Sequence, residues 1–370
     1  MLSDVCRAVE QTVDWTVSND AESARAVLAQ YPRVLNCCDE LAFDSGAQAL
    51  AYLILHMPDR YCRMLQVLER LLIHARLPVG RSHNFAALDV GAGPGPGIFA
   101  IRGFYAALAV YTKLFDPSWQ VAPLGCARIV ERSAAMPWVM HRFAEALITA
   151  EQLRLADHDS SIHTSNLLAL ELQKSATPFG AHHDDFAAFD LRDEHQRARQ
   201  RLAVELSEEL ELGMAAANRL AHDEPLAAPS GTALAVMMNF LTTAETIPRF
   251  SAAIERLMRG SLVPGGTLLA IGATGDKYSK IYSQLDDQAI AARLNIVDGF
   301  DQPLHADHRL DELATIKALT RKLWHRLETT AGDATQTKEE LLRLNATDIF
   351  DDSTPFTLPR FKVRAYRRGL

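Results

Sequence analysis

FAALDVGAGPGPGIFAI, from Phe85 to Ile101, is the most informative segment of this chain. An apolar run leads into a glycine-rich turn, and a second apolar run follows it. This order predicts a buried strand, a tight turn and a buried helix. Gly91, Gly93 and Gly95 let the backbone turn sharply and approach a ligand closely, with amide groups available to bind it. We therefore expect a ligand-binding turn at the end of the first strand.

Apolar runs and helical patterns alternate after this turn. Short apolar runs predict strands at 127–131, 187–191, 233–241 and 267–273. The remaining patterns predict helices at 197–222 and 247–262, a turn at 263–266 and a final edge strand at 361–366. Strands that alternate with helices predict an α/β fold. We expect a Rossmann-like, doubly wound, mostly parallel sheet with a helical N-terminal region and helical insertions.

The first 80 residues differ in character, because apolar positions recur there at three- and four-residue spacings. This spacing predicts a helical cap over residues 1–80. Its clearest helix is expected to begin at Pro58, since proline is favoured in a first turn. Residues 81–370 are expected to form the main domain, with a helical insertion at about 140–230 and a helical segment at about 280–345.

The composition is that of an ordinary folded chain, with 370 residues, 48% hydrophobic residues and a net charge of −8. An acidic balance disfavours a surface built to bind nucleic acid, although it leaves one possible. The five cysteines lack the C-x-x-C spacing of a metal site, so we expect reduced thiols in a cytoplasmic protein. The uncharged window at 225–244 contains prolines and a glycine, so no membrane span is predicted.

An acidic residue follows the glycine turn at the end of the next predicted strand. This residue, Glu131, could accept hydrogen bonds from two adjacent ribose hydroxyl groups. The distance along the chain from Gly95 to Glu131 exceeds the usual twenty or so residues, so an insertion around 115–119 is expected. The combination predicts a nucleoside-containing ligand.

Five segments then carry a resemblance: LDVGAGPG at 88–95, VERS at 130–133, AFDL at 188–191, the apolar run at 233–241 and VPGG at 263–266. Together they resemble the class I S-adenosylmethionine-dependent methyltransferases, over about residues 85–275 and the last strand. A dehydrogenase more often shows G-x-G-x-x-G. Here the third glycine comes two residues after the second and Asp89 precedes the turn, which suits a sulfonium amino acid better than a dinucleotide. The resemblance implies S-adenosylmethionine as the cofactor.

A second resemblance is narrower. AYLILHMPDRYCRMLQVLERL, at 51–71, is similar to the helix before the first motif in methyltransferase-like proteins of small-ribosomal-subunit assembly. Their downstream cysteine cluster is missing from this chain. An RNA- or ribosome-associated role is therefore the alternative to an enzyme that acts on a small molecule.

The methyltransferase resemblance implies roles for individual residues. Gly91, Gly93 and Gly95 would wrap the methionine part of the cofactor, and Asp89 would hold the turn or the cofactor's amino group. Glu131 would bind the ribose hydroxyl groups. A turn without a ligand and a solvated glutamate are the purely structural interpretations of the same residues.

The resemblance also places residues around the adenine and the methyl group. Met136 would cover the adenine, and Asp190 with the Leu191 backbone would read its amino edge. Asn239 and Phe240 would lie beside the transferable methyl group. An ordinary core position for Met136 and a helix cap at Asp190 are the structural alternatives.

Methyl transfer is an in-line displacement, so much of the catalysis can come from holding the acceptor near the methyl carbon in a desolvated pocket. We expect an enclosed pocket for a small-molecule acceptor beside Asn239, with Tyr61, Phe240, Tyr278 and Tyr282 as candidate lining residues. Packed amphipathic side chains are the structural alternative for the three tyrosines. No general base is assigned. The histidines lie in polar loops without helical H-x-x-x-H spacing, so no metal site is predicted. The sequence leaves the acceptor atom and the oligomeric state open.

Overall fold

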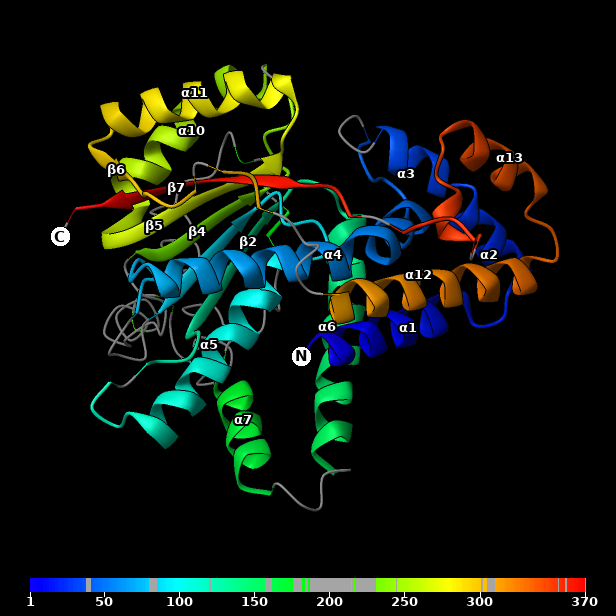
Figure 1. The fold of residues 1–370 in the computed structure, drawn as a ribbon, viewed down its shortest axis with the longest axis horizontal. Helices are drawn as coiled ribbons and strands as arrows, with labels where there is room; N and C mark the ends of the chain where they lie inside the picture. The colour runs from blue at the N-terminus through cyan, green and yellow to red at the C-terminus, as the bar shows by residue number, and fades with distance from the viewer. Residues whose placement is uncertain are drawn as a thin grey trace.

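The computed structural model describes residues 1–37, 41–79, 85–119, 121–156, 162–175, 182–183, 186, 214, 216, 231–243, 245–300, 302–304, 310–351, 353–356 and 358–369. Within them, helices cover both faces of one central sheet (Figure 1). A further group of helices lies beside the sheet and contains the N-terminus.

The sheet has the strand order β3-β2-β1-β4-β5-β7-β6. Its strands are β1 (Ala86–Val90), β2 (Cys126–Glu131), β3 (His182–His183), β4 (Thr232–Met238), β5 (Leu262–Ala273), β6 (Leu294–Ile296) and β7 (Phe361–Arg368). The pairs from β3 to β5 are parallel, whereas β7 runs antiparallel to β5 and β6. The predicted Rossmann-like, mostly parallel α/β sheet is confirmed.

The register brings the carboxyl ends of the central strands together. Val90, the last residue of β1, pairs with Val130 of β2 and with Met237 of β4. The chain passes from β1 to β2 and β3 on one side and returns to β4 and β5 on the other. The strand order therefore reverses between β1 and β4, which is where open α/β sheets bind their ligands.

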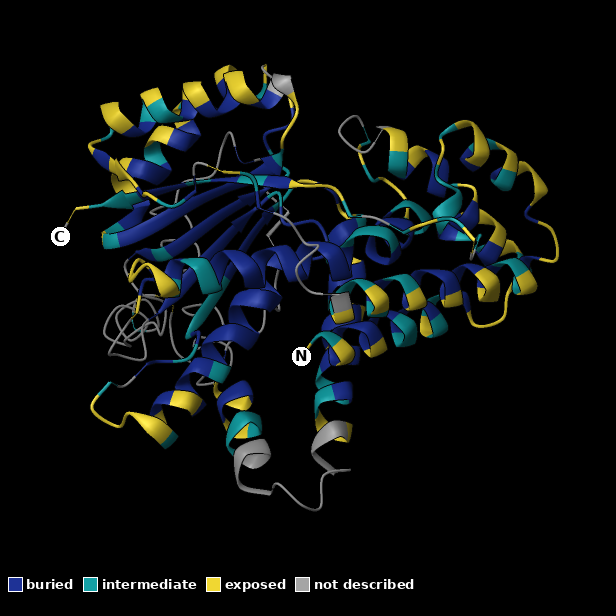
Figure 2. Cartoon of the chain, in the orientation of Figure 1, coloured by how far each residue is buried: buried dark blue, intermediate teal, exposed yellow. Residues whose placement is uncertain are grey.

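Two hydrophobic cores lie on opposite faces of the sheet. One face packs against α4 (Gly46–Ile73), α5 (Pro96–Phe115) and α6 (Ala135–Ala156), and the other against α10 (Thr246–Arg256) and α11 (Asp276–Ala291). In β4, Leu234 and Val236 join the first core, whereas Ala235 and Met237 join the second. Both faces of β4 are thus buried, as its continuous apolar sequence requires (Figure 2).

The helices beside the sheet come from both ends of the chain. They are α1 (Leu2–Val17), α2 (Ala21–Leu28), α3 (Tyr31–Cys37), α12 (Leu310–Ala331) and α13 (Thr335–Arg343). Trp324 of α12 is fully buried, and its ring lies 5.7 Å from that of Tyr31 and 5.3 Å from that of Phe350. The helical region beside the sheet therefore combines the predicted N-terminal cap with part of the segment at 280–345.

The region at 140–230 is described only in part. α6 extends to Ala156 and buries Phe143 and Leu147 in the first of the two cores. α7 (Ile162–Lys174) packs beside α5. The predicted strand at 187–191 lies outside the described residues. So does nearly all of the predicted helix at 197–222.

The helix predicted to begin at Pro58 begins twelve residues earlier along the chain, so that boundary is wrong. α4 starts at Gly46, and the Ser45 hydroxyl oxygen caps it by accepting a hydrogen bond from the backbone N–H of Gln48 at 3.2 Å. Pro58 lies inside the helix. Proline removes one backbone donor there. The burial of most of this 28-residue helix offsets that loss.

The last strand was predicted at an edge of the sheet, and that position is wrong. β7 is an internal strand, paired with β5 on one side and β6 on the other. The segment at 263–266, predicted as a turn, belongs to β5, where Gly265 has a φ of 75° and the pairing with β4 is irregular. The edge position of β7 was predicted wrongly because its neighbour β6 has only three residues and interrupts a region predicted as helical.

α5 is the one helix among the described residues that is long and apolar enough to cross a membrane, with a mean hydropathy of 1.4. In this fold it packs between β1, α4 and α7, and 67% of its most apolar window is buried. Its composition therefore fits a core helix.

Trp324→Ala should lower the free energy of unfolding by about 3–5 kcal/mol, because it empties the centre of the helical region. Trp15→Ala is the matched control, since the Trp15 side chain of α1 is 40% exposed. Denaturant unfolding of both variants measures the difference. Equal losses would contradict the central place of Trp324.

Candidate functional site

The glycine turn after β1 has a backbone that other residues rarely adopt. Gly91, Gly93 and Gly95 have φ values of 64°, 56° and 84°. A Cβ atom on Gly91 would also overlap the Phe240 ring. Both the left-handed conformation and the close approach of the β4 end therefore require glycine at position 91.

Asp89 lies buried beneath this turn. Its Oδ2 atom accepts a hydrogen bond from the backbone N–H of Ile98 at 3.2 Å, in the first turn of α5. A Cβ atom on Gly97 would lie only 2.7 Å from the same oxygen, so glycine lets the helix approach the carboxyl group. The Asp89 Oδ1 atom is buried and has no hydrogen-bond partner among the residues that the structure describes. Asp89 thus holds the turn through Oδ2 and keeps a second oxygen unused.

The environment of Asp89 alters its protonation. Burial raises the pKa of the Asp89 carboxyl from 3.8 to about 7, and the negative charge of Glu131 adds to the rise. The hydrogen bond from Ile98 acts in the opposite direction. Near neutral pH, the carboxyl group therefore exchanges between its acid and its ionised form.

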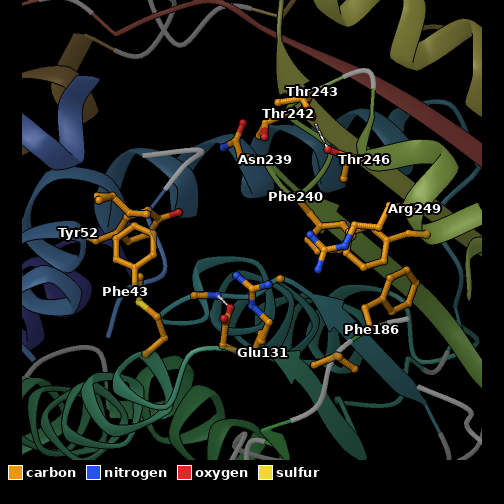
Figure 3. Close-up of a pocket in the computed structure, with 17 residues that line it drawn as sticks. Phe43, Tyr52, Glu131, Phe186, Asn239, Phe240, Thr242, Thr243, Thr246 and Arg249 are labelled. Atoms are coloured by element: carbon orange, nitrogen blue, oxygen red, sulfur yellow. Dashed lines mark hydrogen bonds between the residues drawn. The ribbon is translucent and has the colours of Figure 1, made fainter. Parts of the chain in front are cut away.

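Glu131 connects the end of β2 to the glycine turn. Its Oε2 atom accepts a hydrogen bond from the Gly93 N–H at 2.8 Å (Figure 3). Its Oε1 atom accepts one from the Ser133 N–H at 2.9 Å. Each carboxylate oxygen can accept a further bond. The carboxylate can therefore hold the turn and still accept bonds from two adjacent hydroxyl groups.

A cavity of about 310 Å³ opens between these groups, at the carboxyl ends of β1, β2 and β4. Six residues predicted for the site line it: Gly91, Gly93, Glu131, Met136, Asn239 and Phe240. Figure 3 shows Phe240 and Arg249 on one side of the cavity and Phe43 and Tyr52 on the other. The cavity therefore lies where the strand order of the sheet reverses.

The cavity wall that faces the sheet was not predicted from the sequence. Tyr52 of α4 and Phe43 before it line the cavity, with their rings 5.1 Å apart. The Arg60 guanidinium lies 4.5 Å from the centre of the Tyr52 ring. Tyr52 and Arg60 are eight residues apart on one helical stripe. That spacing was the available signal, but it does not show which side of the helix meets the sheet.

Several predicted residues lie elsewhere. Gly95 is the N-cap of α5 and does not line the cavity. Tyr61 is buried against Gly103 of α5, where burial raises the pKa of its hydroxyl group. Tyr282 packs under β5 and donates its hydroxyl hydrogen bond at 3.4 Å to the Ala273 carbonyl and at 3.3 Å to the Lys362 carbonyl. Tyr61 and Tyr282 are thus packing residues in this structure.

Asp190 and Leu191, predicted at the adenine, lie outside the described residues. Within the described parts of the chain, no three His, Cys, Asp or Glu side chains gather where they could hold a metal ion.

A second cavity, of about 380 Å³, lies beyond the end of β4. Asn239 lines both cavities, and Tyr278 lines the second. Asn239 has a φ of 51°, and its backbone N–H donates a hydrogen bond to the Ile271 carbonyl at 2.7 Å. This residue therefore contributes to the walls of both cavities, with a backbone conformation that asparagine tolerates better than most residues.

Comparison with known proteins adds little to this geometry. No family model matches the chain, and no curated protein matches it. The solved structure of YcgJ from Bacillus subtilis aligns with 84% of this chain and 99% of its own, at 10% identity and a TM-score of 0.34. YjhP from Escherichia coli aligns with 84% of this chain and 91% of its own, at 12% identity and a TM-score of 0.33. At these values neither protein assigns a function, and the fold rests on the chain's own strand order.

Asp89→Asn should change how stability depends on pH. Because folded Asp89 keeps its proton up to about pH 7 whereas the unfolded carboxyl loses it near pH 4, this residue lowers the free energy of unfolding as the pH rises between these values. The loss approaches about 1.4 kcal/mol per pH unit and ends above pH 7. Asparagine removes this contribution, so the variant should lose less stability over the same range.

Denaturant unfolding at several pH values measures the slope. Asp287→Asn, at an exposed position on α11, is the control and should keep the wild-type slope. A slope unchanged in Asp89→Asn would contradict the buried, proton-holding state of Asp89.

Proposed function

We propose that this chain is an S-adenosylmethionine-dependent methyltransferase that acts on a small molecule. One observation carries the proposal. The left-handed glycine turn and the Glu131 carboxylate border the same cavity, at the point where the strand order reverses. A tight left-handed turn that a ligand can approach closely, beside a carboxylate with unused lone pairs, matches a ligand with an amino-acid part and a ribose.

The residues present fit this cofactor. The cavity of about 310 Å³ falls within the usual range for ligand sites, about 300–1,000 Å³. Phe43, Tyr52 and Met136 supply apolar surface that suits a flat adenine ring. The unused Oδ1 of Asp89 lies under the turn, where an ordered water or an ammonium group of the ligand would satisfy it.

The fold also favours this cofactor over a dinucleotide. The dinucleotide-binding sheet has the strand order 3-2-1-4-5-6. Here the antiparallel strand β7 stands between β5 and β6. The turn sequence G-x-G-x-G departs from the dinucleotide pattern as well.

When bound, S-adenosylmethionine would supply an electrophilic methyl group. The chain's own residues orient this reaction and exclude water from it. Glu131 and the glycine turn fix the cofactor's position, and Asn239 contributes to the walls of both cavities. The main contributions are therefore proximity and desolvation, with no general base assigned.

Replacement of Glu131 tests the cofactor site. Glu131→Ala should weaken S-adenosylmethionine binding by about 1–3 kcal/mol, because the ribose hydroxyls lose their charge-assisted hydrogen bonds. Glu131→Gln should weaken it less, since the amide oxygen still accepts one bond. Isothermal titration calorimetry with S-adenosylmethionine and S-adenosylhomocysteine measures both effects.

Glu145→Ala is the matched control, because the Glu145 side chain on α6 is 56% exposed and lies away from the cavity. An unchanged affinity in folded Glu131→Ala would show that another group binds the ribose. If neither ligand bound to the wild-type protein, the proposed cofactor would be rejected.

The RNA-associated alternative predicts a different result. Among the described residues that line the first cavity, only Arg132 and Arg249 are cationic, too few for strong phosphate binding. We therefore expect weak binding of a labelled RNA hairpin, measured by fluorescence anisotropy at about 50 and 200 mM salt. Tight binding that falls steeply between these salt concentrations would support the alternative.

A further inference from the structure

The second cavity is lined mainly by apolar residues. It lies between α4, α12, the end of β5 and the segment that leads into β7. Nine of its lining residues are apolar: Val34, Leu35, Leu55, Ala273, Ala346, Ile349, Phe356, Leu358 and Pro359. Such a lining suits a ligand with a mostly apolar body.

Among the described residues that line this cavity, the charged groups balance one another. Arg63 and Asp59 form a buried ion pair, with Nη2 and Oδ2 2.6 Å apart and a second bond of 2.9 Å from Nε to Oδ1. Both side chains are 6% exposed. Arg60 and Asp348 add one formal charge of each sign. A charged ligand would therefore lose its hydration without meeting an opposite net charge, and an uncharged ligand is favoured.

His56 supplies the one polar side-chain atom among the described lining residues that is buried without a partner. Its ring donates a hydrogen bond to the Val34 backbone carbonyl, and its Nε2 has no hydrogen-bond partner. The donor is therefore Nδ1. Burial and the charge of Arg63 lower the pKa of His56 to about 4. The ring is therefore neutral near pH 7, and Nε2 carries a lone pair that can accept a hydrogen bond.

The same helix connects His56 to the proposed cofactor cavity. The His56 ring lies 4.9 Å from the ring of Tyr52, at an interplanar angle of 64°. Tyr52 lines the first cavity, His56 lines the second, and Asn239 lines both. A molecule in the second cavity would thus lie next to a cofactor in the first.

We infer that the second cavity binds the methyl acceptor as an uncharged, mostly apolar molecule, whose hydrogen-bond donor is recognised by Nε2 of His56. The identification of this ligand as the acceptor rests on the proposed function. His56 is a specificity residue here, because it orients the donor group without being required to take the proton.

Three naphthalene probes test the ligand chemistry on the full chain. They share an apolar body and differ in one group: 1-naphthol donates a hydrogen bond, 1-methoxynaphthalene does not, and 1-naphthoate is an anion. By isothermal titration calorimetry, 1-naphthol should bind about tenfold more tightly than either other probe, as expected for one buried acceptor left unpaired.

His56→Phe keeps an aromatic ring but removes the acceptor, so 1-naphthol and 1-methoxynaphthalene should bind this variant about equally. The ratio of the two affinities is informative because a merely structural role of His56 would weaken both probes alike. His56→Gln should restore part of the preference for 1-naphthol, since its amide oxygen accepts a hydrogen bond. His325→Phe is the matched control, because His325 is 56% exposed on α12 and lies outside the cavity.

If His56→Phe does not fold, Ala346→Leu provides an independent test, because it fills part of the cavity and should weaken 1-naphthol. Equal binding of 1-naphthol and 1-methoxynaphthalene to the wild-type protein, tighter binding of 1-naphthoate, or no binding of any probe would overturn the inference. Calorimetry with S-adenosylmethionine separates the two proposals. Cofactor binding without 1-naphthol binding rejects only the acceptor class, and the reverse result rejects only the methyltransferase assignment.

Discussion

The contact between the first turn of α5 and the buried Asp89 carboxyl governs the arrangement of the rest of the site. Because Gly97 has no side chain, the helix comes close enough for the Ile98 N–H to reach this carboxyl. The turn before the helix must then bend back through left-handed conformations, and this bend presents the Gly93 N–H to Glu131. Helix, turn and neighbouring strand are thereby fixed together. A ligand meets a preformed surface, which lowers the entropy cost of binding.

The sequence predicted the parts of the fold that depend on local patterns. The apolar run before the glycine turn gave β1, and the acidic residue at the end of β2 was placed beside that turn, as the structure has it. The start of α4 was wrong because Pro58 is compatible with a first turn locally, whereas its interior position depends on packing. The prediction that β7 is an edge strand was wrong because alternating apolar and polar residues do not show how many strands pair with it.

The candidate site likewise combines residues that local sequence patterns predicted with residues that only tertiary packing brings there. The sheet side of the first cavity comes from residues at or directly after the ends of strands, and local sequence patterns predicted these residues for one site. The opposite wall comes from Tyr52 and Phe43, more than thirty residues before the glycine turn. Only tertiary packing brings this wall to the sheet. Tyr61, chosen from the same helix, faces α5 instead, because nine residues along a helix rotate the side chain away from the stripe of Tyr52.

The position of β7 bears on how the chain assembles during its synthesis. β5 and β4 are close in sequence and can pair once both have been synthesised, but the other edge of β5 pairs with residues 361–368, which follow much later in the chain. Until then β6 has no strand to pair with among the described residues. An unpaired β5 edge invites contact with other chains. A nascent chain of this protein therefore carries an open, apolar sheet edge from the synthesis of β5 until β7 has followed it.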